Sequence, residues 1–135
     1  MSVRAFLDTN ILIYAVGADP HRTPAAERLL LAGGYISVQV LNEFVAVARR
    51  KLNMAWPDVH AALSSIRQLC AAPTPLDGAL HDAGLVLAER HNLSIYDALI
   101  VAAAQAARCE VVYSADMHHG HRFDGGLRIE NPFAP

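Results

Sequence analysis

Short apolar runs that suit β-strands alternate along this chain with longer segments whose apolar residues recur at helical spacing. The expected strands cover residues 3–7, 35–37, 110–114 and 127–130, and the expected helices cover residues 11–16, 24–32, 38–53, 58–70, 77–91 and 94–108. Strands that alternate with helices favour a mostly parallel sheet with helices on both faces. The sequence therefore predicts an α/β chain with three layers, α/β/α.

The size and composition of the chain fit a single domain over residues 1–135. Hydrophobic residues make up 53% of it, enough to bury a core without a disulfide framework. The two cysteines, Cys70 and Cys109, lie far apart beside apolar segments, so we expect buried free thiols in a reducing compartment. The N-terminus has no hydrophobic signal region, and the longest apolar run is too short for a bilayer. We therefore expect a cytoplasmic protein.

Two acidic residues follow expected strands. Asp8 ends the first strand, and Asp116 comes two residues after the strand EVVYS. In open sheets with parallel strands, ligands bind beyond the carboxyl ends of the strands. The two carboxylates are therefore expected to share one site.

Two further acids lie in helices, where Glu43 borders the apolar face and Asp97 is turned toward the core. Glu43 has Val40 and Val47 as helical neighbours, and Asp97 has Ile100 and Val101. A carboxylate that faces a core is costly unless a cation or a hydrogen bond compensates it. Two inward acids on separate helices, together with two at strand ends, could converge on Mg²⁺ or Mn²⁺, which favour oxygen ligands and can activate water for phosphodiester cleavage.

Each acid also has a purely structural explanation. Asp8 would cap the helix that follows it, and Asp97 forms an S-x-x-D helix start with Ser94. Glu43 could pair with an arginine at the end of its helix, and Asp116 could be a turn residue. These explanations account for the acids singly but not for their common placement at strand ends and inner helix faces.

Four segments in order resemble the PIN-domain family, and in particular its bacterial VapC-type toxins. FLDTNILIYA is similar to the family's opening strand, and VLNEF to the helix that carries its glutamate. LSIYDALIVAAA and VYSADMHHG resemble the segments with the third and fourth acids, and the NPF ending also fits. The resemblance runs from about residue 4 to residue 133.

The resemblance implies a single PIN-like domain with endoribonuclease activity that depends on Mg²⁺ or Mn²⁺. It assigns the acidic site to Asp8, Glu43, Asp97 and Asp116. Asp8 and Asp97 would bind metal directly, Glu43 would bind metal or orient water, and Asp116 would act partly through water. The expected partners are RNA, either tRNA or another structured or single-stranded RNA, a small antitoxin protein and a second copy of the chain.

The resemblance also gives roles to three polar residues beside the acids. Thr9, Asn10 and Ser114 occupy the flanking positions. Their hydroxyl and amide groups are expected to hydrogen-bond the metal ligands or contact the substrate.

The basic residues do not by themselves indicate a nucleic-acid binder, because the net charge is −2. If four acids gather in one site, however, the remainder of the chain is net positive. Arg49, Arg50 and Lys51 complement the dipole at the end of their helix, and an RNA contact there remains open. The sequence HHGH at 118–121 is interpreted as a polar loop, with zinc binding or RNA contact as alternatives.

Other phosphate-handling folds fit the sequence less well. A haloacid-dehalogenase phosphatase needs D-x-D after its first strand, where this chain has Asn10. A receiver domain needs a lysine at a later strand end, and the only lysine lies in a helix. Walker and Rossmann glycine-rich loops do not occur. A PIN-like module that binds RNA or acts as a scaffold without turnover remains the alternative to the nuclease.

Overall fold

A parallel sheet forms the centre of the computed structural model, which describes residues 3–134. Its three strands run in the order β1-β2-β3, where β1 is Ala5–Leu7, β2 is Val111–Tyr113 and β3 is Arg128–Glu130. Phe6 lies opposite Val112, and Val112 lies opposite Ile129. These three side chains are at most 1% exposed, so the middle residue of each strand belongs to the core.

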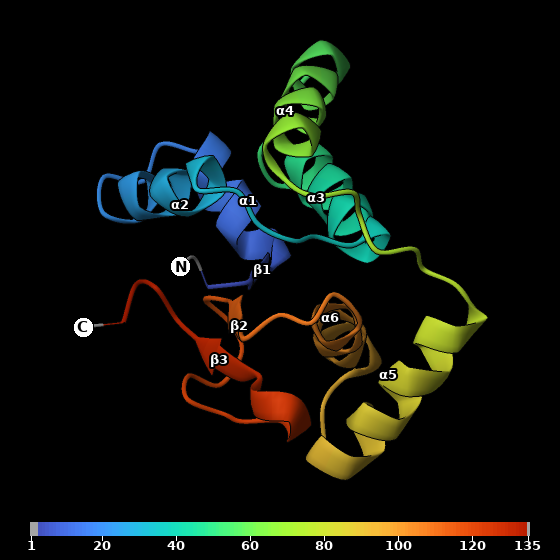
Figure 1. Ribbon diagram of the computed structural model, residues 1–135. Helices are drawn as coiled ribbons and strands as arrows, with labels where there is room; N and C mark the ends of the chain where they lie inside the picture. The colour runs from blue at the N-terminus through green and yellow to red at the C-terminus, as the bar shows by residue number, and fades with distance from the viewer. Residues whose placement is uncertain (1–2, 135) are drawn as a thin grey trace.

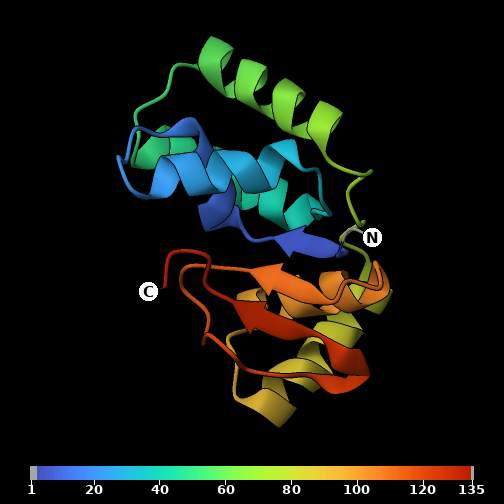
Figure 2. The same ribbon diagram turned by 60° about the vertical axis from the view of Figure 1, so that its left-hand side comes forward.

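Six α-helices surround the sheet. They are α1 (Thr9–Val16), α2 (Arg22–Leu31), α3 (Val38–Arg50), α4 (Trp56–Leu69), α5 (Gly78–His91) and α6 (Ile95–Ala106), and a short 3-10 turn, η1 (Asp124–Gly126), precedes β3. Figures 1 and 2 show α1 to α4 gathered on the β1 side of the sheet, while α5 and α6 lie together on the other side. The predicted α/β/α architecture is therefore confirmed.

Local sequence explains where several helices begin and end. The side chains of Ser37, Asp77 and Ser94 accept hydrogen bonds from the backbone of the first turns of α3, α5 and α6. Asn92 adopts the left-handed conformation, with φ of 54°, and ends α5. The caps fix the directions of α3 and α6, the helices that carry Glu43 and Asp97.

The strand predicted at residues 35–37 is present only as isolated parallel bridges. Phe6 bridges Tyr35, and Ser37 bridges Thr74. Ser37 is already the N-cap of α3, so this segment is too short to form a regular ladder. The helix predicted to reach residue 53 ends at Arg50, and Asn53 leaves it with φ of 53°.

The core lies between the sheet and the helices, and α6 is its most buried helix. Seven consecutive residues of α6, Ala98 to Ala104, are buried. Both cysteines are free and buried, as predicted, and burial raises the pKa of each thiol to about 11. None of the helices in residues 3–134 combines the length and the apolar character needed to span a bilayer.

Candidate active site

Asp8 lies at the junction of β1, β2 and α1. Its backbone N–H donates to the carbonyl of Tyr113 at 3.0 Å, which ties it to the end of β2. Its Oδ1 accepts from the backbone N–H of Thr9 at 2.7 Å, and its Oδ2 accepts from the Ser114 hydroxyl at 2.8 Å. The side chain therefore caps α1, as the structural explanation predicted, and also presents a carboxylate at the carboxyl end of the sheet. The residue is only 6% exposed.

Asn10 and Ser114 connect Asp8 to Asp116. The Asn10 amide donates to Asp116 Oδ2 at 3.2 Å and to Asp8 Oδ2 at 3.4 Å. The backbone N–H groups of Asp116 and Met117 donate to the Ser114 hydroxyl at 3.3 and 3.1 Å. The two strand-end acids thus share neutral hydrogen-bonding partners, and Asn10 and Ser114 lie where the sequence placed them.

Glu43 faces the same region from α3. The Thr9 hydroxyl donates to its Oε2 at 2.7 Å, and the Gln39 amide donates to its Oε1 at 2.9 Å. The expected alternative, an ion pair with an arginine at the end of α3, does not occur among the residues the structure describes. Gln39 was not predicted as a site residue, although its position one turn before Glu43 was a usable signal.

Asp97 enters from the first turn of α6. The Ser94 hydroxyl accepts a hydrogen bond from the Asp97 backbone N–H at 3.1 Å. Ser94 thus provides the predicted cap, and the Asp97 carboxylate lines the cavity. Since α3 and α6 contact one another, Glu43 and Asp97 approach this region from neighbouring helices.

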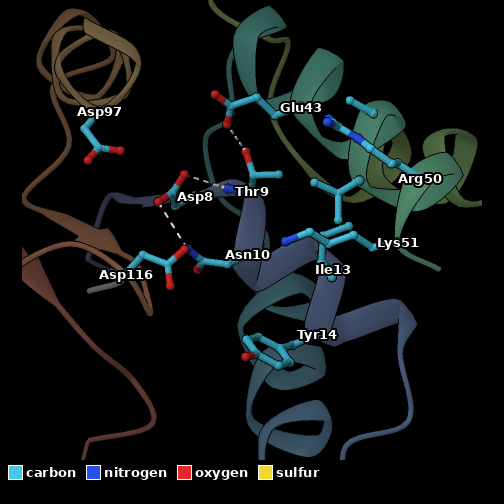
Figure 3. Close-up of a pocket in the computed structure, with 12 residues that line it drawn as sticks. Asp8, Thr9, Asn10, Ile13, Tyr14, Glu43, Arg50, Lys51, Asp97 and Asp116 are labelled. Atoms are coloured by element: carbon cyan, nitrogen blue, oxygen red, sulfur yellow. Dashed lines mark hydrogen bonds between the residues drawn. The ribbon is translucent and has the colours of Figure 1, made fainter. Parts of the chain in front are cut away.

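All four acids line one cavity of about 480 Å³ (Figure 3). Figure 3 shows their carboxylates directed toward a common space, with Arg50 and Lys51, at the end of α3, across from Asp8 and Asp116. Arg50 and Lys51 also line the cavity, which leaves an RNA contact by these residues open. The cavity is therefore lined by four carboxylates and by two cationic side chains.

Mutual repulsion and burial disfavour the charged forms of two of the acids. Burial raises the pKa of Asp8 to about 6, the negative charges of Glu43 and Asp97 add to this, and the hydrogen bonds from Ser114 and Thr9 oppose it. The pKa of Asp97 is also raised, first by burial and then by the charges of Glu43 and Asp116. A bound cation would relieve both effects.

The donor set fits a hard, well-hydrated cation better than a closed metal cage. Within residues 3–134, no three His, Cys, Asp or Glu side chains are already placed to hold one ion. Mg²⁺, however, keeps several waters and uses one or two carboxylates, and Mn²⁺ shares its preference for oxygen. The hydrogen bonds that hold Asp8, Glu43 and Asp116 come from the neutral side chains of Ser114, Thr9 and Asn10, so these bonds do not pair the carboxylates with a positive side chain.

The histidines of the HHGH loop make separate contacts. The His119 Nδ1 accepts from the backbone N–H of Asn131 at 2.9 Å. The His121 Nε2 lies 3.2 Å from the Nδ1 of His91, at the end of α5. The contact with His91 was not predicted, because 30 residues separate the two histidines.

Carboxylates gathered beyond the carboxyl ends of parallel strands form an arrangement that can hold a divalent cation. Residues 5–121 match the PIN domain family, so the chain belongs to this family and the predicted resemblance is confirmed. No curated protein matches the sequence.

Solved structures of bacterial toxins share the fold. A toxin–antitoxin complex from Klebsiella pneumoniae gives a TM-score of 0.70 at 24% identity, over 95% of this chain and 97% of that chain. VapC20 of Mycobacterium tuberculosis, a sarcin–ricin loop cleaving toxin, gives 0.65 at 20% identity, over 83% and 89%. VapBC2 of Rickettsia felis, bound to a DNA fragment from its promoter, gives 0.67 at 22%, over 96% and 98%. Likeness at these identities establishes the fold alone.

Proposed function

We propose that this chain is a metal-dependent endoribonuclease and the toxin of a toxin–antitoxin pair. The observation that carries the proposal is that four carboxylates line one cavity, and they come from the junction of β1 and α1, from α3, from α6 and from the loop after β2. The family supports an activity on RNA, since one relative of the same fold cleaves the sarcin–ricin loop. The relatives solved as toxin–antitoxin complexes support an antitoxin as partner, and a homodimer is also part of the proposal.

The acids would hold Mg²⁺ or Mn²⁺ in this cavity. Asp8 and Asp97 are proposed as direct ligands. Burial and nearby like charges raise the pKa of both carboxyls, and a bound cation would stabilise their ionised forms. Glu43 would bind metal or orient the attacking water, and Asp116 would act partly through water. When bound, the ion supplies an activated water and neutralises charge that builds up on the phosphate.

The remaining residues of the cavity hold the acids and the substrate. Thr9 and Gln39 fix the orientation of Glu43, while Asn10 and Ser114 hold the carboxylates of Asp116 and Asp8. Arg50 lies at the cavity margin, where its planar guanidinium is suited to bind an RNA phosphate. The phosphate would thus lie between the four carboxylates, with the cation that they hold, and Arg50 at the end of α3.

The test of this function is cleavage of a mixed RNA pool by antitoxin-free protein. We expect cutting with Mg²⁺ or Mn²⁺ and none with a chelator, because the acids cannot activate water alone. RNA fragments are resolved by gel and their ends are sequenced. Folded protein that binds RNA but leaves it intact with either metal would instead favour the non-catalytic RNA-binding module.

Thr9→Val is expected to lower the cleavage rate by about 10- to 100-fold, the usual effect of removing a group that orients a metal-site ligand. Valine keeps the size of the buried side chain but cannot donate to Glu43, whose Oε2 now accepts from the threonine hydroxyl at 2.7 Å. Thr9→Ser keeps the donor and is the matched control. A Thr9→Val enzyme as fast as wild type would exclude this role for the hydroxyl. The rates are measured under single-turnover conditions.

A further inference from the structure

A second cavity of about 400 Å³ lies beside the acidic one. It is lined by His21, Arg22, Ala25, Pro132 and Phe133. Its residues come from the start of α2 and from the segment after β3, so neither the acids nor α3 contribute to it. The lining combines an aromatic ring, a guanidinium and an imidazole.

Tyr14 separates the two cavities. It lines the acidic cavity, where Figure 3 shows its ring below Asn10. Its ring also packs edge-to-face on Phe133, with centroids 5.2 Å apart and an interplanar angle of 72°. The guanidinium carbon of Arg22 lies 5.4 Å from the centre of the same ring. Two of the side chains that line the second cavity, Phe133 and Arg22, therefore contact a residue that lines the first.

Hydrogen bonds fix the segment that carries Phe133 to the acidic site. The backbone N–H of Phe133 donates to the Asn131 side chain at 2.9 Å, and the Asn131 amide donates to the carbonyl of Ala115 at 3.4 Å. The Ala115 N–H in turn donates to the Asn10 side chain at 2.9 Å. The position of the Phe133 ring is thus linked to the loop that carries Asp116.

The Arg22 side chain is paired with one carboxylate but remains accessible to a ligand. It pairs with Asp19 at 3.2 Å, but 48% of its side chain is exposed. Asp19 also accepts from the backbone N–H groups of His21 and Arg22 at 2.9 and 2.8 Å, and these bonds lower its pKa. Asp19 therefore serves mainly to cap the start of α2, and about half of the Arg22 side chain remains exposed at the cavity that it lines.

We propose that this second cavity binds the nucleotide next to the cleaved bond of a single-stranded RNA. Phe133 would stack on the base, and Arg22 would hold the phosphate that links it to the cleaved position. Exposed bases of single-stranded RNA stack on aromatic side chains, and arginine binds phosphate in a bidentate way. The inference rests on the proposed ribonuclease function, because the scissile phosphate is assigned to the acidic cavity.

The test compares four variants in an Asp97→Asn background, which prevents cutting. Arg22→Gln and Phe133→Leu alter the second cavity, and Arg28→Gln removes the same charge from an exposed position of the same helix. Binding of a fluorescein-labelled single-stranded RNA is titrated by anisotropy at several salt concentrations in Mg²⁺. Phe133→Tyr, which keeps an aromatic ring, controls for packing on Tyr14.

Phe133→Leu is expected to weaken RNA binding about tenfold, the effect of losing one stacked base, while Phe133→Tyr binds like the parent. Arg22→Gln should weaken binding and lower the slope of log Kd against log salt by about 0.7, the value for one phosphate contact on a single strand. Arg28→Gln should change neither. Arg22→Gln is on the surface, so it remains informative if Phe133→Leu does not fold.

The inference is overturned if Arg22→Gln and Phe133→Leu both bind RNA as tightly as Arg28→Gln does. This holds also if the two variants fail to bind a protein partner, since the second cavity would then be a protein-binding site. Wild-type cleavage is measured separately on the same RNA. Metal-dependent cutting with no effect of the two variants would retain the nuclease and remove the subsite. Loss of binding in the variants, with no cutting by wild type, would retain the subsite and remove the nuclease.

Discussion

Asp97→Asn should reduce RNA cleavage by at least about 1,000-fold, since a metal ion contributes several kcal/mol of transition-state stabilisation. The substitution removes one of four carboxylates from the cavity and keeps the size of the side chain. Helix α6 keeps its N-terminal cap, because the Ser94 hydroxyl accepts from the backbone N–H of residue 97 and not from its side chain. The effect should therefore be on the chemistry and not on the fold.

The same variant should be at least as stable as wild type in the absence of metal. Burial and the charges of Glu43 and Asp116 raise the pKa of Asp97, so its ionised form is disfavoured in the folded protein. Asp82→Asn on the exposed face of α5 removes the same charge away from the cavity and is the control. Thermal unfolding in chelator gives the stability of each variant. An Asp97→Asn protein that cuts RNA at the wild-type rate, or that unfolds, contradicts the assignment.

The four acids could be predicted because general rules of topology and periodicity place them. Asp8 and Asp116 follow parallel strands, and the carboxyl ends of adjacent parallel strands meet at one edge of the sheet. Glu43 and Asp97 interrupt the apolar faces of two helices, which indicates the interior before any contact is known. These rules hold whatever the details of side-chain packing.

The contacts that orient the acids could not be predicted to the same depth. Thr9 and Asn10 were expected beside the site, but only the structure pairs Thr9 with Glu43 and Asn10 with Asp116. Gln39 was missed because a glutamine on a helix is ordinarily a surface residue. These pairings depend on side-chain conformations across 34 and 106 residues of chain, and sequence spacing does not determine such conformations.

The segment after β3 was also more informative in the structure than in the sequence. The NPF ending was noted only as part of the resemblance, yet Asn131 and Phe133 form a hydrogen-bonded support next to the acidic cavity. The edge-to-face packing of Phe133 on Tyr14 spans more than 100 residues of chain. Local periodicity contains no information about such a contact, so the position of Phe133 at the second cavity could be recognised only from the three-dimensional structure.

Metal-free protein is expected to lose stability as the pH rises from about 4 to about 7, and Asp8 is the main cause. The pKa of Asp8 is about 6 in the folded protein and 3.8 ordinarily. Below pH 3.8 the carboxyl is protonated in both states, so the full stability is present. As the pH passes through 6 the buried group ionises, and the folded state loses about 3 kcal/mol, at 1.36 kcal/mol for each pH unit between the two values. The raised pKa of Asp97 acts in the same direction.

Asp8→Asn separates this effect from other titrations. The amide oxygen of asparagine can still accept from the Thr9 N–H, so the cap of α1 is kept while the charge is lost. Urea unfolding in chelator should show wild type less stable at pH 7.5 than at pH 5, with a smaller difference for Asp8→Asn. Added Mg²⁺ should restore stability to wild type at pH 7.5 more than at pH 5, because only the ionised carboxylates attract it. Equal stability of wild type in chelator at both pH values would mean that folding does not raise the pKa of Asp8. Relief of the unfavourable ionised form of Asp8 would then contribute nothing to cation binding.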